Sequence, residues 1–98
     1  MTETYSHTTW KVKPGMEDEF VERWSEWVEW SHLQGLGARA TLLRDVESPG
    51  TFISYGPWAS FDAVKSWRGL TGYHERVARL QEVVESFDPR TLRLVAER

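Results

Sequence analysis

The chain has 98 residues, of which 40% are hydrophobic and 28% are charged, and its net charge is −3. This size and composition are typical of one globular domain spanning residues 1–98. The mild acidity and the lack of a basic cluster argue against a nucleic-acid partner. Because the sequence also lacks a long apolar run and a basic-then-apolar N-terminal segment, we expect a cytoplasmic protein with no membrane partner.

Cysteine is absent, which excludes disulfides, thiolate nucleophiles and cysteine-based metal sites. The six tryptophans are the unusual feature of the composition. Tryptophan buries a large flat surface and has one N–H group that needs a partner when it is buried. The tryptophans therefore indicate either an aromatic-rich core, which is the commoner arrangement, or a cavity shaped for a flat aromatic ligand.

The first half of the chain predicts a strand, a helix and a second strand. Residues 5–12 are rich in β-branched and aromatic types and predict a strand that ends at Pro14 and Gly15. Residues 16–31 predict a helix with an acidic first turn, which Gly35 and Gly37 end. Its apolar residues cover about half of the circumference, so we expect it to cover a sheet. Residues 38–47, beginning at Ala38, predict the next strand.

The second half begins with a turn at residues 48–50 and a strand at 51–55, which completes a hairpin. Ser60 is the expected N-cap of a short helix over residues 61–67. After a glycine break, residues 72–86 predict another helix, capped by Thr71 and ended by Asp88 and Pro89. Residues 91–96 alternate and predict the last strand. The apolar stripe of the helix predicted over residues 72–86 consists of Tyr73, Val77, Leu80, Val84 and Phe87.

The order β-α-β-β-α-β predicts a ferredoxin-like α+β fold, with two helical segments on one face of a four-stranded antiparallel sheet. The other face would carry one alternating set of strand residues, such as Phe52 or Ile53 and Leu92 or Val95. No further part of the chain is left to cover that face. A second subunit could cover it, so we expect a homodimer.

The candidate acids, bases and ligands are few. His7, His32 and His74 show no metal-binding spacing, and no metal site is predicted. His74 is the best acid–base candidate, because it lies at the edge of the apolar stripe, although a hydrogen-bonded structural histidine is the commoner reading. Arg68 and Arg76 flank the glycine break near several aromatic residues. They could hold an acidic or phenolate-like ligand, or be surface arginines paired with a glutamate.

Several segments together resemble the antibiotic biosynthesis monooxygenase family over residues 5–96. They are the run 12–15 before an acidic helix, a glycine-preceded strand with Ala38 and Arg39, the turn at 48–50 and the run 55–61. The resemblance implies a dimeric α+β barrel with a pocket between the helices and the sheet of each subunit. Some members are cofactor-independent oxygenases of polycyclic phenols, in which the deprotonated substrate passes an electron to O₂.

The resemblance also assigns individual positions. In the oxygenase pattern, Trp58 stands at the Trp position and Arg76 at the Arg position, while Ser54 replaces an Asn and Val64 replaces a Tyr. Another branch of the family degrades haem. Trp67 matches the Trp of that branch, but Thr8 and Val77 stand where its Asn and its axial His belong, and His74 lies one turn away.

The leading hypothesis is a homodimeric, cofactor-independent monooxygenase that acts on a flat hydrophobic aromatic compound, polyketide- or quinol-like. The alternative is a non-catalytic dimer of the same fold that binds a small ligand or haem, or one whose tryptophans only pack. The expected catalytic residues are His74 for proton transfer, Arg76 for anion stabilisation, and Trp58. The expected ligand-binding residues are Trp24, Trp27, Ser54, Trp67 and Tyr73.

Overall fold

A computed structural model describes residues 3–35 and 39–98 of the chain. The strands are β1 (Thr4–Val12), β2 (Thr41–Arg44), β3 (Thr51–Trp58) and β4 (Val84–Arg93), and the helices are α1 (Glu17–Leu33), α2 (Phe61–Arg68) and α3 (Tyr73–Gln81). The strands form one antiparallel sheet in the order β2-β3-β1-β4. The predicted ferredoxin-like α+β fold is therefore confirmed.

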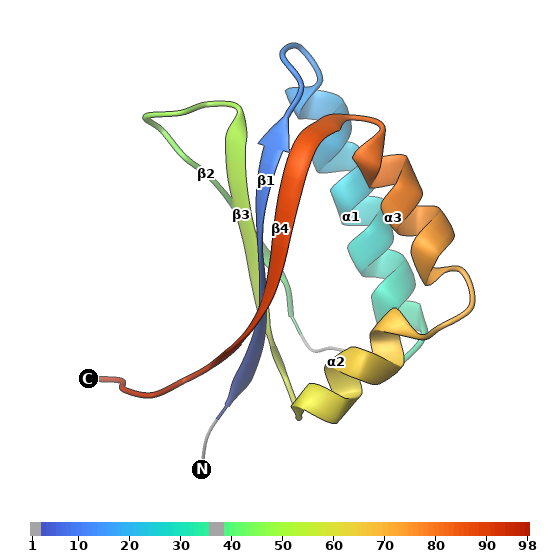
Figure 1. Ribbon diagram of the computed structural model, residues 1–98, viewed down its shortest axis with the longest axis vertical. Helices are drawn as coiled ribbons and strands as arrows, with labels where there is room; N and C mark the ends of the chain where they lie inside the picture. The colour runs from blue at the N-terminus through green and yellow to red at the C-terminus, as the bar shows by residue number, and fades with distance from the viewer. Residues whose placement is uncertain (1–2, 36–38) are drawn as a thin grey trace.

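The molecule has two layers, because α1 and α3 lie side by side against one face of the sheet (Figure 1). The short helix α2 lies at one end of these two helices. Its predicted N-cap is confirmed, since the Ser60 hydroxyl accepts a hydrogen bond from the backbone N–H of Ala63 at 3.1 Å. Within the described ranges, no helix combines the length and the apolar character that crossing a membrane requires.

The core lies between the two layers. Trp10 and Phe52 point from neighbouring strands toward the helices, where they meet Phe20 of α1 and Leu80 of α3, and all four are at most 3% exposed. The ring of Phe20 lies 5.3 Å from that of Trp10 and 5.1 Å from that of Phe52, measured between centroids. Burying these large apolar side chains is the main stabilising contribution to the fold.

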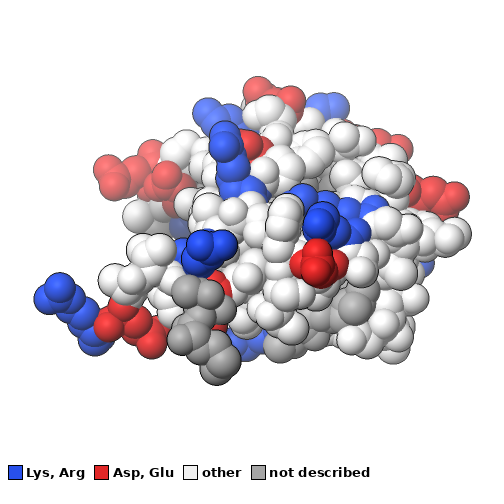
Figure 2. Space-filling model, turned by 60° about the horizontal axis from the view of Figure 1, so that its bottom comes forward, with Lys and Arg blue, Asp and Glu red and all other residues white. Residues whose placement is uncertain are grey.

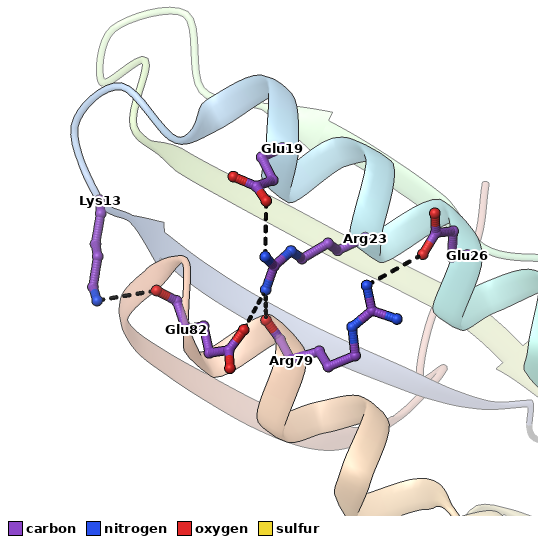
Figure 3. A network of polar contacts seen from close by, with 6 residues as sticks. All are labelled: Lys13, Glu19, Arg23, Glu26, Arg79 and Glu82. Atoms are coloured by element: carbon purple, nitrogen blue, oxygen red, sulfur yellow. Dashed lines mark hydrogen bonds and ion pairs between the residues drawn. The ribbon is translucent and has the colours of Figure 1, made fainter.

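A polar cluster joins the helices above this packed end of the core (Figure 3). The guanidinium of Arg23 on α1 donates hydrogen bonds to Glu19 at 2.8 Å, to Glu82 at 2.7 Å and to the backbone carbonyl of Arg79 at 2.6 Å. Lys13, which follows β1, donates to the backbone carbonyl of Glu82 at 3.0 Å. The cluster therefore ties α1 to the C-terminal end of α3 and to the end of β1.

The boundary between α3 and β4 differs from the prediction. The expected helix over residues 72–86 ends at Gln81, β4 starts at Val84, and Pro89 lies inside that strand instead of ending the helix. Val84 pairs with Val12 and Ser86 with Lys11, so residue 85 forms a β-bulge. The bulge turns Val84 and Phe87 to the same face, which imitates the three-residue spacing of a helix. Pro89 is tolerated because β4 is an edge strand.

Three smaller predictions were wrong. The strand expected over residues 38–47 is β2, which ends at Arg44, because the Asp45 carboxylate accepts hydrogen bonds from the N–H groups of Glu47 and Ser48 and forms a turn. The expected positions Gly37 and Ala38 lie outside the described residues. The last strand ends at Arg93 instead of residue 96. Gly72, with φ +94°, is the N-cap of α3 instead of Thr71, because the turn needs a left-handed conformation that favours glycine.

The face of the sheet opposite the helices is bare in the single chain (Figure 1). By alternation along β3, Phe52 faces the helices and Ile53 and Tyr55 face outward. Leu43, Tyr55 and Leu92 are 51%, 36% and 45% exposed. The predicted uncovered face therefore exists and carries apolar side chains, and of the alternatives named above Ile53 and Leu92 lie on it. Val95 lies beyond the end of β4.

Candidate functional site

A cavity of about 70 Å³ lies between the sheet and the helices, on the side of the core toward α2. Eight Trp, Tyr and Phe residues line it, and they come from six elements. α1 and β3 contribute two each and β1, α2, α3 and β4 contribute one each, and these are Trp24, Trp27, Tyr55, Trp58, Trp10, Trp67, Tyr73 and Phe87. Flat, mostly apolar walls with a few polar groups are typical of small-molecule sites.

Trp67 is the centre of the aromatic wall. Its ring lies 5.0 Å from those of both Trp27 and Trp58 and 4.9 Å from that of Tyr73, which meets it edge-on at 77°. Tilted and edge-to-face pairs at these distances are favourable beyond the burial of their area. The four rings therefore form one rigid unit that holds together α1, β3, α2 and α3.

Serine hydroxyls fix the orientation of three indoles. Trp67 Nε1 donates to Ser31 Oγ, Trp58 Nε1 to Ser6 Oγ and Trp10 Nε1 to Ser54 Oγ, each at 2.9 Å. Ser31 is itself anchored, because its hydroxyl donates to the Trp27 backbone carbonyl at 3.0 Å. Each indole is thus held by its apolar contacts and by one hydrogen bond, which gives it a defined orientation.

The other two indoles of the wall, on α1, are not satisfied in this way. The Nε1 atoms of Trp24 and Trp27 are buried and have no hydrogen-bond partner among the described residues. Buried donors without a partner are rare, and each costs about 1–3 kcal/mol. These two indole N–H groups therefore have no acceptor oxygen within hydrogen-bond distance among the described residues.

The charged residues of the wall are both arginines. Arg39 and Arg68 line the cavity, as does His32, and no Asp or Glu among the described residues does. Arg39 reaches this position because Gly56, which has no side chain, lets the backbone carbonyl of Arg39 lie directly against β3. By contrast, basic and acidic side chains are interspersed with uncharged residues on the face shown in Figure 2.

Tyr73 and Arg68 form the most polar part of the wall. Burial raises the pKa of the Tyr73 hydroxyl above its ordinary value, and the charge of Arg68 opposes that rise. Tyr73 is therefore a neutral phenol at pH 7 and can donate a hydrogen bond. Arg68 is half-buried, and its Nη2 lies 3.5 Å from Thr91 Oγ1 on β4.

The structure brings together six of the eight site residues expected from the sequence. They are Trp24, Trp27, Ser54, Trp58, Trp67 and Tyr73. His74 and Arg76 lie outside the lining. His74 is exposed and packs edge-on against Tyr73, and the guanidinium of Arg76 lies 4.8 Å from the ring of Trp30. On a helix, the residue that shares the face of Tyr73 is Val77, four positions later, and Val77 does line the cavity.

Other lining residues were not identified from the sequence, namely Ser6, Ser31, His32 and Arg39. A signal existed for the two serines. Ser31 follows Trp27 by four positions, so it lies on the apolar face of α1, and Ser6 alternates with Trp10 on the inward face of β1. A serine on an apolar face that is rich in tryptophan indicates a partner for an indole N–H.

The oxygenase pattern and the haem-branch pattern of the family resemblance differ in how many of their positions line this cavity. The haem-branch positions Thr8, Trp67 and Val77 all line it. Haem does not fit these residues, because Val77 offers iron no donor atom, His74 is outside the lining and a cavity of about 70 Å³ is much smaller than the macrocycle. Val64, at the Tyr position of the oxygenase pattern, is fully buried elsewhere in the core. Among the described residues, no three His, Cys, Asp or Glu side chains could hold a metal ion.

Comparisons with known proteins agree with this architecture. Residues 5–79 match the family model described as antibiotic biosynthesis monooxygenase. No curated protein sequence matches the chain. Among solved structures, SnoaB from Streptomyces nogalater, a cofactor-independent oxygenase, is 18% identical with a TM-score of 0.79, over 98% of this chain and 94% of that one. A Bordetella bronchiseptica protein whose description places it in the same family is 15% identical with a TM-score of 0.84, over 100% of both chains. At these identities the likeness shows a shared fold.

Proposed function

The chain belongs to the antibiotic biosynthesis monooxygenase family, and from this premise we propose that it is a small cofactor-independent monooxygenase. Its substrate is a flat hydrophobic aromatic compound, polyketide- or quinol-like, and it works as a cytoplasmic homodimer. The observation that carries the proposal is the cavity walled by Trp58, Trp67 and Tyr73. SnoaB, of similar fold, is a cofactor-independent oxygenase, which supports the same chemistry here.

The reaction class needs no electron donor besides the substrate. An activated ring CH₂ group gives up its two hydrogens, one atom of O₂ forms the new carbonyl, the other leaves as water with those hydrogens, and the substrate supplies all four electrons that O₂ takes up. A hydroquinone reacts with the same balance to give a hydroxyquinone and water. The protein has to orient the ring, favour its anionic form and exclude bulk water.

We propose that particular groups of the lining perform these tasks. The Trp58 and Trp67 indoles present rigid aromatic surfaces to a ring. The sequence favours His74 for proton transfer and Arg76 for anion stabilisation, whereas the geometry favours Tyr73 and Arg68, since these two face the cavity. Tyr73 can donate a hydrogen bond to a substrate oxygen, and Arg68 can stabilise the negative charge that develops on it.

Oxygen consumption with an anthrone and with a hydroquinone tests the proposal. We expect one O₂ consumed for each quinone formed, followed by an oxygen electrode and by absorbance. Tyr73→Phe should lower the rate roughly 10²-fold if Tyr73 moves a proton, and His74→Ala should do so if His74 does. Trp30→Phe, outside the lining, is the control. If the wild-type protein consumes no O₂ with either compound, the enzyme proposal fails.

The alternative is a binding protein of the same fold without turnover. The small volume of the cavity and the lack of a lining carboxylate among the described residues favour it. Saturable binding of an aromatic compound, measured by tryptophan fluorescence, without O₂ consumption would establish it. Absence of both would leave the tryptophans with a packing role.

The homodimer is supported by the bare apolar face of the sheet, with Leu43, Ile53 and Leu92 on its outer side. Sedimentation should show a dimer at micromolar concentration. Leu92→Glu should weaken it, because a buried carboxylate is costly. Leu33→Glu, on α1 and 79% exposed, is the matched control. A monomeric wild-type protein at micromolar concentration would contradict the dimer.

A further inference from the structure

The charge of the cavity wall is opposite to that of the whole chain. The chain carries a net charge of −3, yet the charged residues that line the cavity are Arg39 and Arg68, and none of the described Asp or Glu residues lines it. A wall with one sign of charge and apolar surroundings concentrates ligands of the opposite sign. Anions are therefore favoured at this site.

Arg68 is the half-buried arginine of the cavity wall. It ends α2, its Nη2 lies 3.5 Å from Thr91 Oγ1, and its charge acts on the neighbouring Tyr73 hydroxyl. It forms no ion pair with any carboxylate in the described part of the chain. Arg23, which is similarly shielded from solvent, binds the carboxylates of both Glu19 and Glu82. A charge removed from water without a counter-charge is costly, so an anion in the cavity would stabilise Arg68.

The volume of the cavity limits the ring system. It measures about 70 Å³, and an apolar protein cavity of ~150 Å³ admits one benzene molecule. Trp27, Trp58 and Trp67 pack against one another along this wall at ring-centroid distances of 5.0 Å. The enclosed space is smaller than one ring needs, so a single ring would lie against these indoles at the mouth of the cavity, and each further fused ring would extend beyond it.

We infer that the ligand is a single-ring aromatic carboxylate whose carboxylate pairs with Arg68 and whose ring lies against Trp67. The inference rests on the proposed function. Of the substrates proposed there it selects the smaller, quinol-like compounds, and it adds a carboxylate to them. A guanidinium recognises a carboxylate through two parallel hydrogen bonds, and the neighbouring phenol of Tyr73 can donate a third.

A pair of ligands of the same shape tests the charge. Calorimetric titration of the wild-type protein compares 2,5-dihydroxybenzoate with its neutral amide. We expect the carboxylate to bind on the order of tenfold more tightly, which is the usual strength of a charge-assisted hydrogen bond. Arg68→Gln should remove this preference, and Arg68→Lys should retain part of it. Lys65→Gln removes the same charge from the same helix at an exposed position outside the lining, and should leave the preference unchanged.

The outcomes separate the inference from the proposal on which it rests. Equal affinity of the wild-type protein for carboxylate and amide overturns the inference and leaves an aromatic site intact. Loss of the preference in Lys65→Gln as well as in Arg68→Gln overturns the role of Arg68. Tighter binding of anthracene-9-carboxylate than of benzoate overturns the single-ring limit. If no aromatic compound binds, the inference and the proposed site both fail. Because the ligand pair is compared on the wild-type protein, the test does not depend on the folding of a variant.

Discussion

The two ends of the space between the sheet and the helices are built differently. At one end, Phe20, Phe52 and Leu80 fill the interior almost completely, and each is at most 3% exposed. The Arg23 cluster ties the helices together over this end (Figure 3). At the other end, indole rings surround a cavity, and serine hydroxyls fix their orientation.

The difference follows from the shapes of the side chains. Interdigitated side chains in their preferred rotamers leave almost no space in a well-packed core. Indoles are large, flat and rigid, and a hydrogen bond at Nε1 fixes each ring further, so space remains between their edges. The packed end should therefore carry the stability of the fold, and the aromatic end should carry the ligand.

Phe20→Ala should have the largest effect on stability. Phe20 is fully buried, and removing a buried phenylalanine ring costs roughly 3–5 kcal/mol of unfolding free energy. Trp58→Ala, at the hollow end, should cost less, because Trp58 is only half-buried and already borders a cavity. Urea unfolding measures both. An equal or larger loss for Trp58→Ala would contradict the division of roles between the two ends.

Ser31→Ala should have an intermediate effect. It leaves the buried Nε1 of Trp67 without an acceptor, and such a donor costs about 1–3 kcal/mol. Ligand affinity should fall as well, because the central ring of the wall loses its anchor. Ser25→Ala is the matched control, since Ser25 lies exposed on the same helix and bonds only the carbonyl of Val21. Equal stability of the two variants would show that the Ser31 bond does not hold the wall.

Arg23→Gln tests the cluster at the packed end. Exposed or partly exposed ion pairs contribute up to about 1 kcal/mol each, so the loss should be modest. It should shrink when urea unfolding is repeated at about 1 M NaCl, because salt screens charges near the surface. Ligand affinity should not change. A loss that is independent of salt would indicate that Arg23 acts through packing instead of charge.

Tyr73→Phe should have the smallest effect on stability, and that effect should be confined to high pH. Burial raises the pKa of Tyr73 in the folded state, so the folded state keeps its proton where the unfolded state loses it. Wild-type stability should therefore be constant below the ordinary tyrosine pKa of about 10 and fall above it. The variant should lose less stability over that range, as measured by urea unfolding at pH 8 and about pH 10.5. The same slope in both proteins would mean that Tyr73 does not contribute.

Local patterns predicted most of the fold. The positions of β1, α1 and β3 depend on alternation, apolar periodicity and the glycine and proline residues between them. The α3–β4 boundary could not be predicted in the same way. Val84 and Phe87 are spaced as on a helix, and only their pairing with Val12 and Trp10 across a bulge makes them part of a strand.

The aromatic character of the candidate site was predictable from the sequence, but only some of its lining residues were. Its tryptophans were identifiable because they are rare and because Trp24 and Trp27 share the apolar face of α1. His74 was expected beside them because it lies at the edge of the predicted apolar stripe, and Arg76 because it stands at the Arg position of the oxygenase pattern. A helix turns by 100° per residue, so neighbours in sequence point in different directions, and Val77 lines the cavity instead.

The sequence by itself determined the order of the elements, the inward and outward faces of the strands and the aromatic character of the interior. These properties depend on residues close together in the chain. Only the tertiary structure decided which groups meet in the cavity, because those contacts join distant positions. The indoles of Trp67, Trp10 and Trp58 bond serines that are 36, 44 and 52 positions away. Arg68, at the end of α2, meets Thr91 of the edge strand β4 in the same way.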